Sequence, residues 1–299
     1  MALKKYMFLE DFQIAEGKEA VDSSRFFSTR KFGGRYLHQI VECIYHESTK
    51  DGEKIVTVVQ GKKGGWIERY GNLSQTGDCW VEQGAIVCGN AVVSEDAIIK
   101  GNAEVGDRAK VRGKSEITDN ATIGEGAVID GYSNISGESE IKGFAFIESA
   151  WISGKTKIEG DVRIICPITF SNEEDQEKFE GMSSQEQRLK TIEISDSEID
   201  ENVYITGGQT YITESKLTGN VVIGGESYIT KKAEIGGNCN ITRSVVAGPI
   251  EIEDVITDNG CIGVVKNISK AWDERADRGV IPYSEQKPSS ITIAEIFVG

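Results

Sequence analysis

The chain has 299 residues, of which 33 are Lys or Arg and 48 are Asp or Glu, so its formal charge at pH 7 is −15. This acidic balance argues against a nucleic-acid partner, because phosphate affinity comes mainly from basic side chains, and it disfavours adhesion to anionic membranes. The chain is rich in Gly, with 34, and poor in aromatic residues, at 8 %, yet a hydrophobic share of 38 % excludes disorder throughout.

The sequence shows no targeting or membrane-spanning segment. The opening MALKKYMFLED has too short an apolar run for a secretory signal, and nowhere do 18 apolar residues run together. We therefore expect a chain that is neither secreted by a signal peptide nor membrane-spanning. The cysteines form no CxxC pair, which favours a reducing compartment and a role as small apolar fillers. They are Cys43, Cys79, Cys88, Cys166, Cys239 and Cys261.

Residues 1–63 differ from the rest, with 11 Lys or Arg against 9 Asp or Glu. Leu37–Val41 and Ile55–Val59 are predicted to form a strand pair around the turn at residues 50–52. We interpret this region as a small β cap that closes the end of the repeat that follows, since an open end presents an unpaired edge. Alternatively, it docks on a neighbouring chain through three phenylalanines, Phe26, Phe27 and Phe32.

From Val81 onwards the sequence repeats every six residues. Twelve consecutive sixth positions carry a β-branched aliphatic residue: Val81, Val87, Val93, Ile99, Val105, Val111, Ile117, Ile123, Ile129, Ile135, Ile141 and Ile147. Four residues after each of the first eleven lies a small residue: Ala85, Ala91, Ala97, Ala103, Ala109, Ser115, Ala121, Ala127, Ser133, Ser139 and Ala145. A helix returns its apolar residues every three or four positions and an ordinary strand every two, so neither explains this pattern.

The period of six predicts very short parallel strands, each followed by a bend, with three strands to a triangular coil. Residues 18 apart then stack, and the β-branched residues form interior ladders that begin at Val81, Val87 and Val93. The second inward position must be small because the interior is narrow. Turn formers such as Gly89-Asn90 suit the corners. Each buried Val or Ile contributes about 1.5–3 kcal/mol, so a regular stack is stable without a thick core.

The [Ile/Val]-x-x-x-[Ala/Ser]-x pattern, over most of residues 73–165 and 194–263, resembles the hexapeptide repeat of left-handed parallel β-helix proteins. The segment that opens it is similar to the start of a bacterial and phage-encoded group, often labelled acyl- or acetyltransferases. That segment reads Gly64-Gly65-Trp66-Ile67-Glu68, Asn72-Leu73-Ser74-Gln75 and Gly77-Asp78-Cys79-Trp80-Val81. The resemblance implies an all-β, single-stranded, left-handed helix whose prisms pack side by side, often about a threefold axis. Right-handed β-helices, including polymer-forming cytoskeletal ones, have similar spacing.

The repeat slips by one residue at Trp151-Ile152 and stops at Pro167. Residues 171–190 are then predicted to form short helices, because two capping-box patterns occur there. They are Ser171 with Glu174 and Ser183 with Glu186. Hexads return at Ile199 and become irregular towards Ile262.

Residues 267–279 are predicted to form a terminal helix with Ser269 as N-cap and Gly279 as its stop. The tail, Ile291–Val298, has strand character and can pair with this chain or another. The predicted organisation is therefore 1–63 cap or docking region, 64–166 first β-helix block, 167–193 insertion, 194–265 second β-helix block, and 266–299 C-terminal helix and tail.

The sequence offers little for catalysis. Acyltransferases of the hexapeptide-repeat family usually use a histidine base between coils or at a subunit boundary, but His38 and His46 both precede the first hexad. A base must reach the substrate, and the carbonic-anhydrase relatives of the family bind zinc with three histidines. We therefore assign no catalytic, cofactor-binding or metal-binding residue. The alternative is that the cap of a neighbouring subunit supplies the imidazole.

Other candidate sites have simpler interpretations. Carboxylates of the insertion, Glu173, Glu174, Asp175, Glu177 and Glu180, could bind a cation or imitate an anionic surface, but they lack calcium-loop spacing and fit a solvated face. Trp66, Trp80 and Trp151 could stack on a sugar, but packing at the coil ends is the default. Gly64-Gly65 and Gly207-Gly208 belong to no phosphate-binding motif.

Three functions follow. The first is a non-catalytic structural or interaction protein with protein partners, a homo-oligomer (trimer favoured) or a larger assembly. The resemblance to phage-encoded proteins implies a virion component such as a tail, fibre or head-decoration subunit, hence a cytoplasmic or virion location. The second is an acyltransferase using acetyl-CoA, which the missing repeat histidine opposes. The third is a self-polymerising scaffold, which the cap and terminal helix would block. For the first we expect no cofactor, nucleic acid or membrane.

Overall fold

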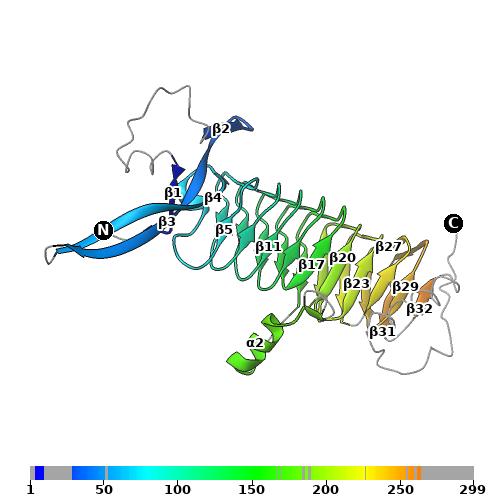
Figure 1. Cartoon of the computed structure of the whole chain (residues 1–299). Helices are drawn as coiled ribbons and strands as arrows, with labels where there is room; N and C mark the ends of the chain where they lie inside the picture. Colours follow the sequence, from blue (N-terminus) through cyan, green and yellow to red (C-terminus); the bar gives the residue numbers. More distant parts are fainter. Residues whose placement is uncertain are drawn as a thin grey trace.

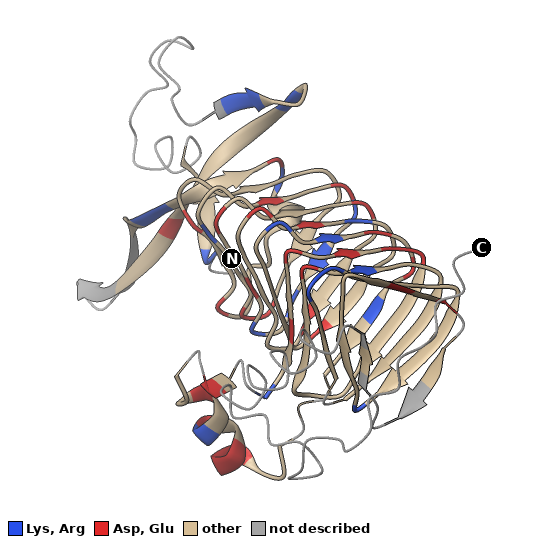
Figure 2. Ribbon diagram, turned by 90° about the vertical axis from the view of Figure 1, so that its right-hand side faces the viewer, with Lys and Arg blue, Asp and Glu red and all other residues tan. Residues whose placement is uncertain are grey.

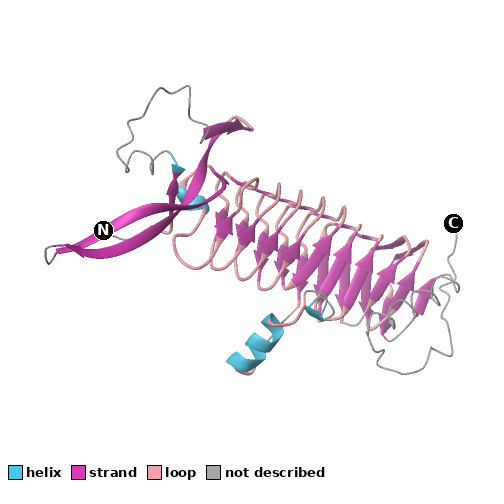
Figure 3. Cartoon of the chain, in the orientation of Figure 1, coloured by secondary structure: helices cyan, strands magenta, loops and turns pink. Residues whose placement is uncertain are grey.

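The computed structural model describes residues 4–9, 29–50, 53–166, 168, 170–183, 186–187, 190–225, 227–253, 255–258 and 261–263. Over these residues the chain is an all-β, single-stranded parallel β-helix of about ten coils, with one strand per coil in each of three sheets (Figure 1, Figure 3). The predicted fold class is thereby confirmed. The predicted terminal helix over 267–279 and the tail over 291–298 lie outside the described residues.

Each side of the prism is one parallel sheet. The first face contains β6 (Ile86–Val87), β9 (Glu104–Val105), β12 (Thr122–Ile123), β15 (Glu140–Ile141), β18 (Lys157–Ile158), β21 (Glu198–Ile199), β24 (Lys216–Leu217), β27 (Ala233–Gly236) and β30 (Ile250–Glu253). The second face contains β7 (Val92–Val93), β10 (Lys110–Val111), β13 (Val128–Asp130), β16 (Phe146–Glu148), β19 (Arg163–Ile165), β22 (Asn202–Thr206), β25 (Asn220–Gly224), β28 (Asn238–Thr242) and β31 (Ile256–Asp258). The third face contains β5 (Trp80–Val81), β8 (Ile98–Ile99), β11 (Glu116–Ile117), β14 (Asn134–Ile135), β17 (Ala150–Ser153), β20 (Ile192–Ser195), β23 (Thr210–Thr213), β26 (Tyr228–Thr230), β29 (Val245–Ala247) and β32 (Cys261–Gly263).

The strand register confirms the predicted stacking of residues 18 apart. Val81 pairs with Ile99, Ile99 with Ile117, and Ile117 with Ile135. The ladders that begin at Val87 and Val93 repeat this spacing on the other two faces. All twelve side chains are fully buried and belong to one core that continues along the axis.

The column of small residues lies where the sequence predicts it, inside the corners of the prism. Its eleven Ala and Ser side chains are at most 1 % exposed. Two of its three serines satisfy their hydroxyls locally, since the Oγ atoms of Ser133 and Ser139 donate to the carbonyls of Asp130 and Ser136 at 2.7 Å, and Ser115 Oγ donates to the Gly131 carbonyl of the next coil at 3.4 Å. A buried hydroxyl with a partner costs little, so serine substitutes for alanine here without opening the core.

Neighbouring coils approach closely at the corners. Gly101 has φ +68°, in the left-handed region, and a Cβ there would lie 2.8 Å from the backbone nitrogen of Asp119 in the next coil. A side chain at this position would therefore strain the backbone and also clash with the adjacent coil.

A β cap covers the first coil, as predicted. It consists of β1 (Tyr6–Phe8), β2 (Thr29–Phe32), β3 (Arg35–Lys50) and β4 (Glu53–Ile67), followed by the short 3-10 helix η2 (Tyr70–Asn72). The end of β4 pairs in parallel with β6, so the cap is continuous with the first face. Tyr6 seals the end of the prism, because its ring is fully buried and its hydroxyl donates to the Leu73 carbonyl at 2.6 Å.

The predicted strand pair around the turn at residues 50–52 is confirmed as the antiparallel hairpin of β3 and β4, but the hairpin is longer than predicted and Leu37–Val41 does not lie opposite Ile55–Val59. Lys50 pairs with Glu53 across the tip, which places Ile44 opposite Val59 and Val41 opposite Lys63. In a hairpin the tip fixes the register. Both predicted segments are strands, but they lie at different distances from the tip and therefore meet other partners.

The insertion leaves the prism after β19 and returns at β20. The predicted slip is confirmed, since Ile135 pairs with Ile152, 17 residues later, and Ile152 then pairs with Ile194 on the far side of the insertion. The insertion is therefore a loop that leaves the prism at one corner, and the third face continues on both sides of it without a missing strand (Figure 1).

The insertion contains the predicted short helix α2 (Glu173–Glu180). Its N-cap is Asn172, whose side chain accepts the Asp175 N–H at 2.9 Å, so the predicted cap at Ser171 is wrong by one residue. Asn is at least as good a cap as Ser and lies one position closer to the helix. The second predicted capping box is confirmed: the Ser183 N–H donates to Glu186 Oε2 at 2.9 Å, and the Glu186 N–H donates to Ser183 Oγ at 3.3 Å.

Substitutions at two adjacent residues, one facing inwards and one outwards, test whether the interior is narrow. We expect Ala121→Val to lower the free energy of unfolding by about 1–3 kcal/mol, because the added methyl groups overpack a fully buried corner. Thr122→Val, one residue on and facing outwards, should change it by less than about 0.5 kcal/mol. Urea denaturation of both variants checks this. Equal effects would contradict a narrow interior.

Candidate functional site

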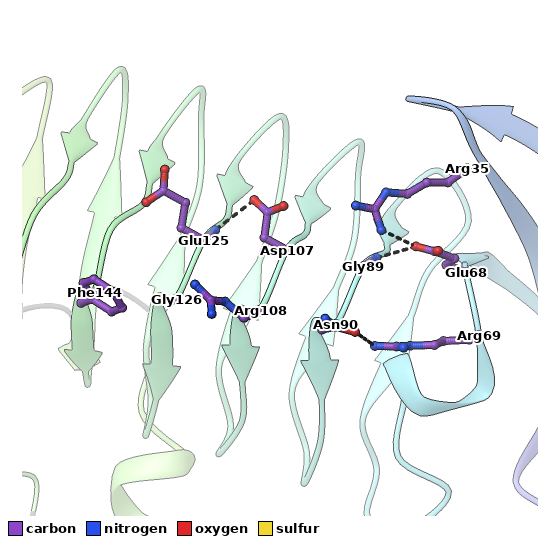
Figure 4. A pocket seen from close by; sticks show the side chains of 10 residues that line it. All are labelled: Arg35, Glu68, Arg69, Gly89, Asn90, Asp107, Arg108, Glu125, Gly126 and Phe144. Carbon is purple, nitrogen blue, oxygen red and sulfur yellow. Dashed lines mark hydrogen bonds and ion pairs between the residues drawn. The ribbon is translucent and has the colours of Figure 1, made fainter.

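A groove of about 510 Å³ runs along the corner where the first face meets the second, next to the cap (Figure 4). The corner loops of successive coils line it, together with three residues of the cap, Arg35, Glu68 and Arg69. Its lining residues are Arg35, Glu68, Arg69, Gly89, Asn90, Asp107, Arg108, Glu125, Gly126 and Phe144. This size is within the range of ligand-binding sites in proteins.

The carboxylates on the outer side of this corner link one coil to the next. Asp107 and Glu125 have left-handed φ angles of +54° and +52°. Asp107 Oδ2 accepts the Glu125 N–H at 3.1 Å, and Glu125 Oε2 accepts the Gly143 N–H at 3.0 Å. A carboxylate that accepts a backbone N–H forms a charge-assisted hydrogen bond, so these residues have a structural use.

The other two corners use the same link. Glu95 Oε2 accepts the Gly113 N–H at 3.0 Å, and Asp119 Oδ2 accepts the Gly137 N–H at 3.0 Å. In each case donor and acceptor are 18 residues apart. Part of the acidic excess of the chain is therefore explained by hydrogen bonds along the axis.

At the cap end of the groove, Glu68 is held by two donors. Its Oε2 accepts the Gly89 N–H at 2.6 Å and pairs with an Arg35 guanidinium nitrogen at 2.9 Å. Burial opposes ionisation of Glu68, but these two donors outweigh it and lower the pKa of the carboxyl group. The pair joins the start of β3 to the first corner of the prism.

Among the described residues, the remaining cations of the groove form no hydrogen-bonded ion pair with a carboxylate, although the charge of Arg69 helps to lower the pKa of Glu68. Arg69 donates to Asn90 Oδ1, and the Arg108 guanidinium forms no hydrogen bond or ion pair with any residue that the structure describes (Figure 4). Phe144, three corners along from Asn90, is 71 % exposed. The groove therefore presents hydrogen-bond donors and an apolar ring, which are groups for recognition.

The two histidines lie in β3 and not on the coils. The His38 ring stacks on Phe8 with 4.6 Å between ring centroids, and His46 is exposed on the hairpin. His38 thus belongs to the packing of the cap. Neither imidazole faces the groove, whose only residue from β3 is Arg35.

The described cysteines fit the prediction of small apolar fillers. Cys79, Cys166 and Cys239 are buried, and no disulfide joins any of the five whose side chains are described. Burial raises the pKa of the Cys166 thiol to about 11. Burial also raises that of Cys79, although Lys5 Nζ lies 3.3 Å from its sulfur. A reactive cysteine needs a lowered pKa, so these thiols are structural.

The acidic insertion is attached to the prism through Glu180. Lys114 Nζ lies 2.6 Å from Glu180 Oε1, and the Tyr132 hydroxyl donates to the same oxygen at 2.9 Å. Hydrogen bonds from Lys114 and Gln176 lower the pKa of Glu180 to about 2, whereas burial and the neighbouring carboxylate raise that of Tyr132 to about 12. The ring of Phe179 packs on Tyr132 at 5.2 Å.

The first turn of α2 remains solvent-exposed. Glu173, Glu174 and Asp175 lie there, at the N-terminal end of the helix dipole, which favours negative charge. Among the described residues, no three His, Cys, Asp or Glu side chains come together as a metal site. Of the carboxylates of the insertion, Glu180 therefore makes a specific contact with the prism, and those of the first helical turn are solvated.

The tryptophans named from the sequence lie beside the cap and on the third face. Trp80 is buried beneath Lys62, whose Nζ lies 4.8 Å from the ring centroid, and Trp66 is covered by the Arg30 guanidinium at 5.0 Å. Trp151 is half-buried in β17. Trp66 and Trp80 thus serve the junction between cap and prism.

Comparison with protein-family models and with curated proteins finds no match to this chain. Within the described part of the chain, no helix has the length and apolar character needed to cross a membrane.

The groove residues were not singled out from the sequence, although a signal exists. Asn90, Arg108, Gly126 and Phe144 are spaced by 18 and so occupy one corner position in four successive coils. A phenylalanine and an arginine are unexpected at a corner position that holds the turn formers Asn90 and Gly126 in the other two coils. Only the fold shows that Arg69, outside the repeat, lies at the same corner.

The attachment of the insertion is testable by titration. Carboxyl ¹³C NMR should show Glu180 titrating near pH 2 in the wild type, and Lys114→Met should raise this midpoint towards the ordinary value of about 4.3. Because the folded pKa lies below the unfolded value, the contact stabilises the docked helix above about pH 4.3 and is lost as the pH falls towards 2.

Lys110→Met is the matched control, because Lys110 lies in the same stretch, is exposed and has no contact with Glu180. An unchanged Glu180 midpoint in Lys114→Met would contradict this account of the docking.

Proposed function

We propose that the protein is a non-catalytic structural or interaction protein, in which the β-helix is a stiff spacer and the hairpin joins it to a second copy of the chain. The observation that carries this proposal is the outer part of the hairpin, residues 43–50 of β3 and 53–60 of β4. We call this segment the hairpin arm. It extends beyond the end of the prism (Figure 1).

At its base the hairpin arm contacts the N-terminal segment, since the Cys43 N–H donates to the Lys5 carbonyl at 3.0 Å and the Tyr45 hydroxyl donates to the Lys4 carbonyl at 2.8 Å. Beyond Tyr45, among the described residues, its two strands pair only with each other: β1 pairs with β3 no further than Glu42, β2 no further than His38, and β6 pairs with β4 only at Trp66 and Ile67. A two-stranded ribbon is marginally stable by itself, and its free edges accept a further strand. The arm thus has the properties of an element that is completed by a partner.

Charge supports a second copy as that partner. Residues 1–63 carry 11 Lys or Arg against 9 Asp or Glu, which leaves 22 against 39 in the remaining chain. Asp and Glu recur along the coil corners (Figure 2). The hairpin arm itself is balanced, with Lys50 and Lys54 against Glu47 and Glu53, and the small positive excess lies in the rest of the cap region. The cap region can therefore approach the acidic prism of a neighbouring copy, whereas two prisms repel one another.

The prism itself suits a spacer. Its ten or so coils, at about 4.8 Å each, span on the order of 45 Å. Each inner coil is hydrogen-bonded to the coils on both sides, so bending would break many bonds at once. The resemblance of the opening motif to phage-encoded proteins supports a virion as the setting, as a tail, fibre or head-decoration subunit.

Sedimentation of the whole protein tests the role of the arm. Ile44, 40 % exposed on the arm, is the apolar side chain to change. We expect the wild type to self-associate and Ile44→Lys to weaken the association about tenfold, because burying an isoleucine contributes about 1.5–3 kcal/mol. Ile256→Lys is the matched control, since Ile256 is 84 % exposed and lies in the last strand of the second face.

A strictly monomeric wild type would contradict the proposal, as would equal weakening by both variants.

A thermal-unfolding scan separates this function from the acyltransferase alternative. A ligand at about 100 times its dissociation constant adds about 2.7 kcal/mol of stability. We expect saturating acetyl-CoA to leave the melting temperature unchanged. A clear upward shift would instead favour the enzyme and direct attention to the corner beside the insertion.

A further inference from the structure

We propose that the groove at the corner of the first and second faces binds an extended acidic peptide segment of a partner protein. Arg69 and Arg108 would receive its carboxylates, and Phe144 would receive an apolar side chain. This inference goes beyond the spacer role and does not depend on it, because the groove and the hairpin arm are separate surfaces.

The shape of the groove depends on a glycine in its floor, which leaves room for an aromatic ring. Gly126 occupies the corner position between those of Arg108 and Phe144. A Cβ on Gly126 would lie 3.1 Å from Cδ1 of Phe144 and 3.3 Å from the Gly143 carbonyl oxygen. The Phe144 ring therefore lies over Gly126, on the side of Arg108, and still exposes 71 % of its surface (Figure 4).

Among the described residues, the carboxylates of the groove make their hydrogen bonds to other groups and none contacts the Arg108 guanidinium. Asp107, Glu125 and Glu68 each accept a backbone N–H of the next coil, and Glu68 also holds Arg35. Arg108 has no partner among the described residues, whereas Arg69 donates to the Asn90 amide and its charge also acts on the Glu68 carboxylate. Guanidinium groups form bidentate hydrogen bonds with carboxylates, so Arg108 is the main donor available to a ligand and the remaining N–H groups of Arg69 are the second.

The length of the groove favours an extended peptide over a compact molecule. From Glu68 to Phe144 it crosses four coil spacings, on the order of 19 Å. At about 3.3 Å per residue, this is the reach of roughly six residues of extended chain. The overall charge of −15 does not prevent binding, because the distant carboxylates are screened beyond about 8 Å at physiological salt.

The same overall charge makes the test diagnostic, because the acidic surface outside the groove offers an acidic peptide no electrostatic attraction. The probe is a fluorescein-labelled hexapeptide of alternating Glu and Phe, followed by fluorescence anisotropy with the full chain at about 0.15 M salt. We expect saturable binding that Arg108→Gln weakens about tenfold, as for loss of a charge-assisted pair. Phe144→Ala and Gly126→Leu should also weaken it, the latter by displacing the ring.

Lys110→Gln is the matched control, since it removes one exposed positive charge two residues from Arg108. It should leave binding unchanged, and Arg108→Gln should leave the sedimentation of the protein unchanged, which keeps this proposal separate from the role of the arm. The proposal is overturned if the wild type does not bind the peptide, if Arg108→Gln binds it equally well, or if a Gln-for-Glu peptide binds as tightly. Binding of polygalacturonate in place of the peptide would overturn it in favour of a polysaccharide site.

Discussion

Backbone hydrogen bonds between strands of successive coils hold this molecule together, and the rest of the structure depends on their spacing along the axis. They fix the coil height at about 4.8 Å and bring each inward side chain directly over its partner in the coil before, which in the regular first block lies 18 residues earlier. Val81 therefore meets Ile99, and Ile99 meets Ile117, at van der Waals distance inside the prism. Stacking of like residues fills a narrow interior without the interdigitation of large side chains that a globular core requires.

The same spacing determines what the corners can be. Adjacent corners are so close that Gly101 has no room for a Cβ, and the acidic residues that replace glycine at left-handed corners accept an N–H from the next coil. A corner position is therefore repeated along one edge of the prism, and a change of residue type in that column alters the surface locally. The groove is such a place, where arginine, glycine and phenylalanine follow one another in a single column.

The fold was predictable because its signal repeats. Twelve β-branched residues at a spacing of six predict short parallel strands with three to a coil, and the slip at Ile152 was equally visible. The register of the hairpin was not predictable, because the sequence pattern of a strand does not show how far that strand lies from the tip. The N-cap of α2 was also missed, because Asn172 and Ser171 are caps of similar strength at adjacent positions. The groove was missed for another reason. It joins Arg69, outside the repeat, to Arg108 and Phe144 within it, and only the winding of the chain brings these together.

The insertion shows how such a molecule tolerates change in length. The chain leaves one corner after β19 and resumes at β20, and Ile152 still stacks beneath Ile194 as if nothing had intervened. A segment of 18 residues could likewise be duplicated or deleted between two corners, and every ladder on either side would meet an equivalent partner. Duplication or deletion of such segments in the gene would therefore change the length of the prism in steps of one coil, about 4.8 Å. The number of repeats in the sequence would then set the distance between the cap and the far end of the prism.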